Sequence, residues 1–182
     1  MQSEISQIIK SSSAIAFSGS RSPHPSSVNV VSEAVASVPV SVPVSVGCQR
    51  GIDAAVREAC PRARVFRAAD FGSGKGAYAA RSMACVRSVA VSGAIPEGIA
   101  GGLWIAFPSS ACPAGLMPSA SSPRCFSGKG SGTWASLAFA IGLGVRSLVW
   151  LPESVSVPVG WGFENLGGGW FLFSPVMQLS LF

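Results

Sequence analysis

The chain has 182 residues, of which 48% are hydrophobic and only 12% are charged, and its formal net charge at neutral pH is +5. This length suits one domain, the scarcity of charge predicts a well-buried sheet, and the positive balance favours an anionic partner over a cationic one. No apolar run approaches the roughly 18 residues of a membrane span, so we expect no membrane partner.

Cysteine and histidine usage argues against a disulfide framework and against a metal site. The chain has five cysteines, no Cys-x-x-Cys pair and a single histidine. An odd number of cysteines without paired spacing is typical of reduced, buried thiols. The polar N-terminus contains Glu4 and no long apolar core, unlike a signal peptide. These features predict a cytoplasmic protein without a bound metal.

Short apolar runs and helical spacing together predict the fold class. Runs rich in Val, Ile, Leu and Phe predict strands at 14–17, 44–46, 64–67, 103–107 and 147–151. Apolar residues at helical spacing predict helices at 26–37, 51–59, 76–91 and 131–143, the first capped by Ser26 or Ser27. Strands that alternate with helices indicate an α/β protein: a Rossmann-like, doubly wound parallel sheet of about five strands in three layers.

The remaining segments divide the chain around this domain. We expect residues 1–13 to form a polar N-terminal arm or a short helix. Residues 14–152 form the predicted domain, and residues 153–182 form an aromatic tail. The aromatic side chains of the tail either fold over the sheet edge or form the contact of a homodimer. Within the domain, 92–101 is a Gly/Pro loop, and 108–130 is a loop of a length that is usually functional or disordered.

The first candidate binding turn follows the first predicted strand. Gly19 and Ser20 have small side chains, so their backbone amides can approach a ligand closely. In open α/β sheets, ligands bind at the carboxyl ends of the strands, which is where this turn lies. Arg21 comes next and is either a clamp for a phosphate or a solvated arginine.

The second candidate turn follows the second predicted strand and opens a helix. Gly47 and Gly51 allow a tight turn, and Arg50 between them is a candidate phosphate clamp. Asp53 comes one turn into the helix, where the helix dipole favours an anion. It is either a capping carboxylate or a group that hydrogen-bonds a ribose hydroxyl or a base.

The third candidate turn precedes the fourth predicted helix and is the strongest of the three. Lys129, Gly130, Ser131, Gly132 and Thr133 combine a cation, glycines and hydroxyls at a helix N-terminus, where backbone amides bind phosphate. The alternative is a plain helix cap with a flexible lead-in. The order and spacing do not match a Walker A loop.

The candidate site includes one further cation, and the sequence offers no pair of catalytic residues. Arg81 lies on an Ala-rich helix and points either inward to a ligand or along the surface to solvent. His24 follows a proline in a turn and is predicted to be a surface residue. Since no nucleophile stands beside a base, we assign no catalytic residue and expect no cofactor.

The order and spacing of these motifs resemble the SLOG superfamily of Rossmann-like domains, which includes the DNA-processing protein DprA (Smf), YspA-like proteins and LOG phosphoribohydrolases. The carriers of the resemblance are Ser18-Gly19-Ser20-Arg21, Gly47-x-x-Arg50-Gly51-Ile52-Asp53, Arg81-Ser82-Met83, Ala106-Phe107-Pro108 and Gly130-x-Gly132-Thr133. It covers residues 14–152. It implies that a nucleotide, a nucleotide-derived signal or, as in DprA, single-stranded DNA binds across the carboxyl ends of the strands.

One departure from the LOG pattern bears on catalysis. LOG enzymes carry Pro-Gly-Gly-x-Gly-Thr-x-x-Glu, and the Glu belongs to their catalytic machinery. This chain has Ser136 at that position and Gly128-Lys129 in place of Pro-Gly. The resemblance therefore implies a non-catalytic binding protein, with DNA processing slightly favoured by the basic balance. The alternatives are a nucleotide hydrolase that uses Asp53, Asp70 or Glu97, and a structural module without a ligand.

Overall fold

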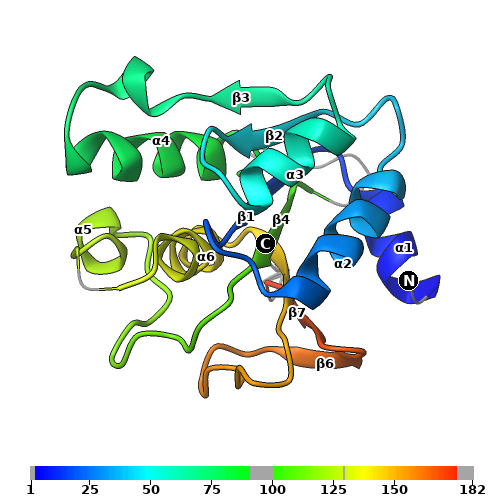
Figure 1. Cartoon of the computed structure of the whole chain (residues 1–182). Coiled ribbons are helices and arrows are strands. Elements are labelled where there is room, and N and C mark those ends of the chain that lie inside the picture. Colours follow the sequence, from blue (N-terminus) through cyan, green and yellow to red (C-terminus); the bar gives the residue numbers. More distant parts are fainter. Residues whose placement is uncertain (1–2, 91–100, 129, 176–182) are drawn as a thin grey trace, which may run out of the picture.

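A mixed β-sheet forms the centre of the protein. The computed structural model describes residues 3–90, 101–128 and 130–175. The strands in these ranges are β1 (Ile15–Gly19), β2 (Val44–Gly47), β3 (Arg64–Phe66), β4 (Leu103–Phe107), β5 (Arg146–Trp150), β6 (Glu164–Gly167) and β7 (Trp170–Phe173). They form one seven-stranded sheet in the order β3-β2-β1-β4-β5-β7-β6 (Figure 1). The first five are parallel, and β7 and β6 continue the sheet in antiparallel pairing.

Helices cover both faces of this sheet. They are α1 (Ser3–Ser11), α2 (Pro25–Ala36), α3 (Ile52–Ala59), the 3₁₀ helix η1 (Ala68–Phe71), α4 (Lys75–Arg87), α5 (Ser122–Cys125) and α6 (Gly132–Gly142). Side chains alternate between the faces of each strand, so Ile15 and Phe17 pack with α1, α2 and α3. Ala16 points the other way and packs with α4, α5 and α6. The result is three layers with two apolar cores (Figure 1).

The predicted fold class is confirmed, and the predicted number of strands is too low. The five expected strands are present with ends shifted by one or two residues. The two additional strands come from the tail, where Gly168 and Gly169 turn the chain with positive φ between β6 and β7. β7 pairs with β5 and buries Trp170 and Leu172. This part of the tail therefore extends the sheet of its own protomer.

The burial of α1 and the start of α2 both follow from their sequences. Residues 3–11 form α1 and place Ile5, Ile8 and Ile9 in the core, because these three positions lie on one helical face. The predicted cap of α2 is wrong. The helix starts earlier, with His24 as the cap that accepts from the Ser26 amide. Pro25 fixes this start, since proline is favoured at the first helical position.

The long loop 108–130 is tied to α6 along its described part. The Trp134 indole donates to the carbonyl of Ser110 at 2.8 Å, and the Ser119 amide donates to the carbonyl of Ala138 at 3.2 Å. At Gly142 a side chain would collide with the backbone of Ser119. The loop thus packs on the helix that it precedes. The predicted loop at 92–101 lies, apart from its last residue, outside the described residues.

Candidate functional site

The strand order indicates the end of the sheet at which a fold of this topology would bind a ligand. From β1 the chain moves to β2 and β3 on one side, and then returns to β4 on the other side of β1. Such a reversal of direction leaves a crevice at the carboxyl ends of the two central strands, which is where open α/β sheets bind ligands. The candidate turns after β1 and β2 and the start of α6 all belong to this edge.

The turn after β1 joins three elements at this edge. The Ser20 amide donates to the carbonyl of Phe107 at the end of β4, and the Ile52 amide of α3 donates to the carbonyl of Ser20 at 3.1 Å. The Ser109 hydroxyl, beyond β4, donates to the Ser20 hydroxyl at 2.7 Å. Ser20 therefore connects β1 to β4 and to α3, and hydrogen bonds within the protein already satisfy its amide and its carbonyl.

Two predicted glycines at this edge are explained by close packing. Gly51 caps α3 with φ +74°, and a side chain there would collide with the carbonyl of Ser20. A side chain at Gly19 would overlap that of Ile52. Both glycines bring α3 against the turn after β1, so their roles in the described structure are those of packing and turn geometry.

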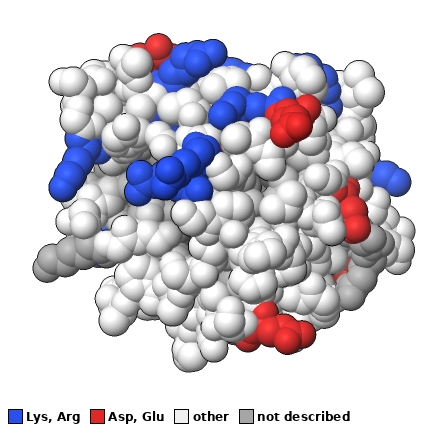
Figure 2. Space-filling view, in the orientation of Figure 1, with Lys and Arg blue, Asp and Glu red and all other residues white. Residues whose placement is uncertain are grey.

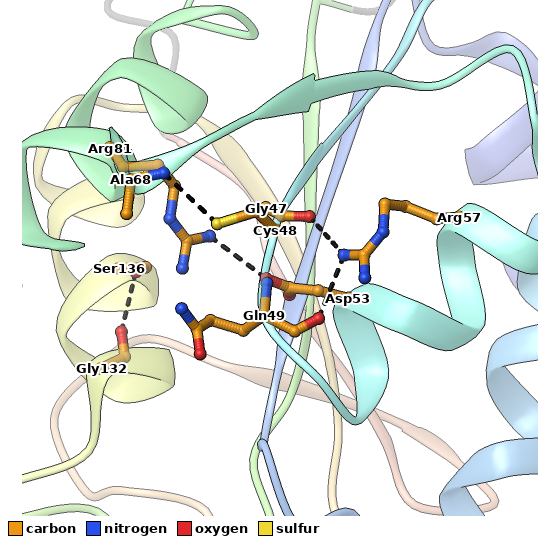
Figure 3. A network of polar contacts seen from close by, with 9 residues as sticks. All are labelled: Gly47, Cys48, Gln49, Asp53, Arg57, Ala68, Arg81, Gly132 and Ser136. Atoms are coloured by element: carbon orange, nitrogen blue, oxygen red, sulfur yellow. Dashed lines mark hydrogen bonds and ion pairs between the residues drawn. The ribbon is translucent and has the colours of Figure 1, made fainter. Parts of the chain in front are cut away.

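A buried ion pair lies beside the end of β2. Arg81 from α4 reaches Asp53 of α3 with Nη1 3.2 Å from Oδ2, and their side chains are 10% and 4% exposed. The Gln49 amide donates to the same carboxylate oxygen at 3.1 Å. Gly47 leaves room for the pair, because a side chain at that position would coincide with Arg81 Nη1 and Asp53 Oδ2. Figure 3 shows this network.

The charges of the pair are only partly compensated by the protein. Burial raises the pKa of Asp53, and the Arg81 guanidinium opposes that rise. Arg81 Nε is buried, and no described residue accepts its hydrogen. A guanidinium carries five N–H groups, so Arg81 retains donor capacity after its contact with Asp53.

A second buried donor lies one strand away. Ser18 is 8% exposed, and no described group pairs with its hydroxyl. Because Phe17 pairs with Val46, the next residue of β1 stands beside Gly47 of β2, at the usual strand spacing of about 4.8 Å. Ser18 also shares the face of Ala16, which is covered by α4 and α6. Ser18 and Arg81 are thus on the same face of the same sheet edge.

The start of α6 borders this pair of donors. α6 packs against α4 and against β1. Gly132 is its first residue, and the space where its side chain would lie is open. Ser131 caps the helix without a side-chain hydrogen bond, Thr133 is 7% exposed, and Gly130 has φ +128° against Pro113. Figure 3 places Gly132 and Ser136 on the side of the network towards which Arg81 and Gln49 extend.

The predicted cations that the structure describes lie at this edge at different depths. Arg81 is buried and reaches Asp53 instead of extending along the surface to solvent, and its contact with a ligand stays a prediction. Arg21 and Arg50 are exposed at the same edge, on the turns after β1 and β2. Lys129 lies outside the described residues. Asp53 is engaged by Arg81 and by the Gln49 amide, so the predicted contact with sugar or base would have to form beside an existing pair.

Sequence reasoning missed the residues that shape the edge through the backbone. Arg57 donates to the carbonyls of Gly47 and Gln49 and so fixes the turn after β2. The Gln49 side chain extends into the network and Ser109 supports Ser20. None of these contacts follows a motif. The available signal was the small-polar composition of the segments that follow the strands.

Comparisons with protein-family models, with curated proteins and with solved structures found no match. Within the described residues, no group of three or more His, Cys, Asp and Glu side chains is arranged to hold a metal ion. No helix in the same ranges has both the length and the apolar character needed to cross a membrane. The resemblance to SLOG domains accordingly remains a prediction that rests on the motifs.

Proposed function

We propose that this protein is a non-catalytic, SLOG-type binding protein that holds a phosphate-bearing ligand at the carboxyl edge of its sheet. The ligand would be a nucleotide, a nucleotide-derived signal or a phosphate of single-stranded DNA, as in DprA-like DNA processing. Arg81 would supply charge, and Ser18 and the first amides of α6 would supply further hydrogen-bond donors.

The observation that carries this proposal is the unsatisfied donor of a buried cation. Arg81 is 8% exposed, and its Nε finds no acceptor among the described residues. An unsatisfied buried polar group costs about 1–3 kcal/mol, and more when it is charged. A phosphate oxygen between Arg81 and the start of α6 would remove this cost and would also interact favourably with the helix dipole.

Ser136 supports the non-catalytic part of the proposal. According to the resemblance, it stands at the position at which LOG enzymes carry their glutamate. Its hydroxyl donates to the carbonyl of Gly132 at 2.7 Å, and the residue is 2% exposed. A hydroxyl engaged within its own helix cannot replace a carboxylate as an acid or base.

Gly132→Asp tests the phosphate site by calorimetry with adenosine monophosphate and with inorganic phosphate. The variant should fold, because the space at this position is open and a carboxylate at a helix N-terminus is favourable. It should lose binding, because the new carboxylate repels the anion. Gly76→Asp is the matched control, since Gly76 is also open and lies in the first turn of α4. Equal binding by both variants, or none by the wild type, would contradict the proposal.

The alternative function is hydrolysis of a nucleotide N-glycosidic bond with an altered active site. Asp53 is the alternative acid or base that lies at the described edge, whereas Asp70 is exposed on η1 and Glu97 lies outside the described residues. We expect incubation with nucleoside monophosphates to release no free base above a protein-free control. Protein-dependent release of adenine on chromatography, lost in Asp53→Asn, would establish the alternative instead.

The predicted homodimer belongs to the same proposal and is tested separately. The described part of the tail buries Trp161 and Trp170 within its own protomer, so these two side chains are not available to a partner. Light scattering coupled to size-exclusion chromatography would give the mass in solution. A mass of one protomer at all concentrations would overturn the dimer and leave the phosphate site untouched.

A further inference from the structure

The net charge of the protein is concentrated in one segment. Residues 50–87 contain eight of the 13 Lys and Arg residues but only three of the eight Asp and Glu residues. This segment therefore carries the entire net charge of +5, and the rest of the chain is neutral. A one-sided excess of this kind favours an extended anionic partner over a small neutral one.

The fold gathers this segment at one edge of the sheet. It comprises α3, β3, η1 and α4, and β3 is the outermost strand. Figure 2 shows Lys and Arg side chains over the part of the molecule where Figure 1 draws these elements. Over the opposite end, where Figure 1 draws β6, the same view shows acidic side chains and no basic ones.

Some cations of the segment are already occupied by the protein. Arg81 pairs with Asp53, and Arg57 donates to two carbonyls of the turn after β2. Arg62 donates to the carbonyls of Val42 and Pro39. Arg57 and Arg62 are thus held by the backbone, and Arg81 belongs to the proposed phosphate site, so none of the three is counted among the cations of the exposed surface.

Three other cations of the segment are exposed along β3, η1 and the start of α4, while Arg87 is exposed at the other end of α4, over the Phe139 ring. Arg64 lies over the Phe66 ring at 4.6 Å from the ring centroid, which fixes its position at the edge. Arg67 caps η1, and Lys75 begins α4. No ion pair ties any of the three to a described carboxylate within 4 Å, although Asp70 is exposed on the same η1.

Two aromatic side chains are exposed among these cations. Tyr78 is 48% exposed and Phe71 is 37% exposed, and they are the exposed large aromatic residues of the described ranges. Tyr78 lies three residues after Lys75, on the same side of α4. Phe71 ends η1, which packs against α4. Single exposed rings are common on protein surfaces, but these two lie among cations, and that combination suits a partner with flat, apolar faces and negative charge.

We propose that the surface formed by Arg64, Arg67, Phe71, Lys75 and Tyr78, here called the η1–α4 surface, binds single-stranded nucleic acid. Cations neutralise phosphates, and exposed rings stack on bases without regard to sequence. Paired bases in a duplex hide their faces, which leaves the two rings without a role. An anionic lipid surface would match the charge and also accept aromatic rings, so binding to anionic vesicles is a separate outcome of the test.

Single-stranded DNA is also among the ligands proposed for the phosphate site, but this inference concerns a second surface, which shares no residue with that site. The phosphate site relies on Arg81, Ser18 and the start of α6, all on the buried side of α4 or at the sheet edge. The η1–α4 surface uses the exposed side of α4. Loss of either function therefore leaves the other measurable.

The test is fluorescence anisotropy with a labelled oligothymidine of about 15 nucleotides, within the usual site size of a single-strand binding module. Three phosphate contacts predict a slope of about −2 in log affinity against log salt, which is a loss of about 20-fold between about 50 mM and about 200 mM salt. Tyr78→Ala should weaken binding about 5- to 150-fold, while Tyr78→Phe keeps most of the affinity because it keeps the ring.

The charge contribution has a matched control within the chain. Lys75→Ala should reduce the salt slope by about 0.7, whereas Lys10→Ala, which removes an exposed lysine from α1, should leave it unchanged. Each variant is compared with the wild type for its circular dichroism and for binding of adenosine monophosphate, and both should be unaltered. Equal effects of the two lysine variants, no effect of Tyr78→Ala, or binding to anionic vesicles but not to the oligonucleotide would overturn the proposal.

Discussion

Gly47→Ala should destabilise the protein by displacing the buried pair of Asp53 and Arg81. The new methyl group would lie 2.6 Å from Arg81 Cζ and would coincide with both atoms of the 3.2 Å contact. β2 lies between β1 and β3, so its backbone cannot move away. Moving the two side chains apart relieves the overpacking, so the dominant cost is that of separating a buried pair, roughly 3–5 kcal/mol. Alanine restricts the unfolded chain and offsets roughly 0.4–1 kcal/mol, so we expect a net loss of about 2–5 kcal/mol.

Urea denaturation followed by circular dichroism measures this loss, and two comparisons isolate its cause. Gly132→Ala makes the same chemical change where the space is open, and it should be neutral or slightly stabilising. In an Arg81→Met background, Gly47→Ala should cost less, because the guanidinium is gone and only the Asp53 carboxylate is still displaced. A Gly47→Ala midpoint equal to that of Gly132→Ala, or an unchanged cost in the Arg81→Met background, would refute the reasoning.

Three other changes test separate parts of the structure. Gly51→Ala should cost about 1–3 kcal/mol in urea denaturation and more than Gly144→Ala, since both have positive φ but only Gly51 lies against a carbonyl. Because burial raises the pKa of Asp53 above 3.8, the folded state binds its proton more tightly than the unfolded state. The stability of the wild type relative to Asp53→Asn should therefore fall as the pH rises from about 4 through the raised pKa, and a rise over the same range would show that Arg81 outweighs burial. Trp170→Ala should cost about 3–5 kcal/mol in thermal unfolding, because the ring is buried edge-on against Phe107 at 5.6 Å, whereas a change within about 1 kcal/mol would mean that the tail is not part of the cooperative unit.

The parallel part of the sheet could be predicted because buried strands carry a strong local signal. β4 is apolar at all five positions and buried at all of them, and β1 is nearly so. The tail gave a weaker signal. Its β7 alternates buried and half-buried positions within a segment rich in glycine, and β6 has only exposed and half-buried positions. Their place in the sheet depends on pairing with β5, which is a contact between distant parts of the chain.

The sequence predicts where the turns at the carboxyl edge lie but not the contacts that connect them. Gly/Ser turns after strands indicate the carboxyl edge of a sheet, and the predicted turns after β1 and β2 do lie there. The ion pair joins residues 28 positions apart, and no spacing rule reports such a contact. Gly47 illustrates the difference. Gly47 leaves room for the Arg81 side chain, which is a requirement of the tertiary structure, whereas the sequence alone indicates only a tight turn.

Arg81 links the stability of the fold to the occupancy of the proposed site. Its Nη1 contacts Asp53, and its buried Nε has no acceptor among the described residues. A phosphate that satisfies the remaining donors would bind the folded state alone, and at a hundred times its dissociation constant it would stabilise that state by about 2.7 kcal/mol. Adenosine monophosphate should therefore raise the melting temperature of the wild type and of Lys75→Ala, but not of Gly47→Ala, in which the guanidinium is displaced. A ligand-induced shift that persists in Gly47→Ala would separate binding from Arg81 and would move the phosphate to the exposed Arg21 and Arg50 of the same edge.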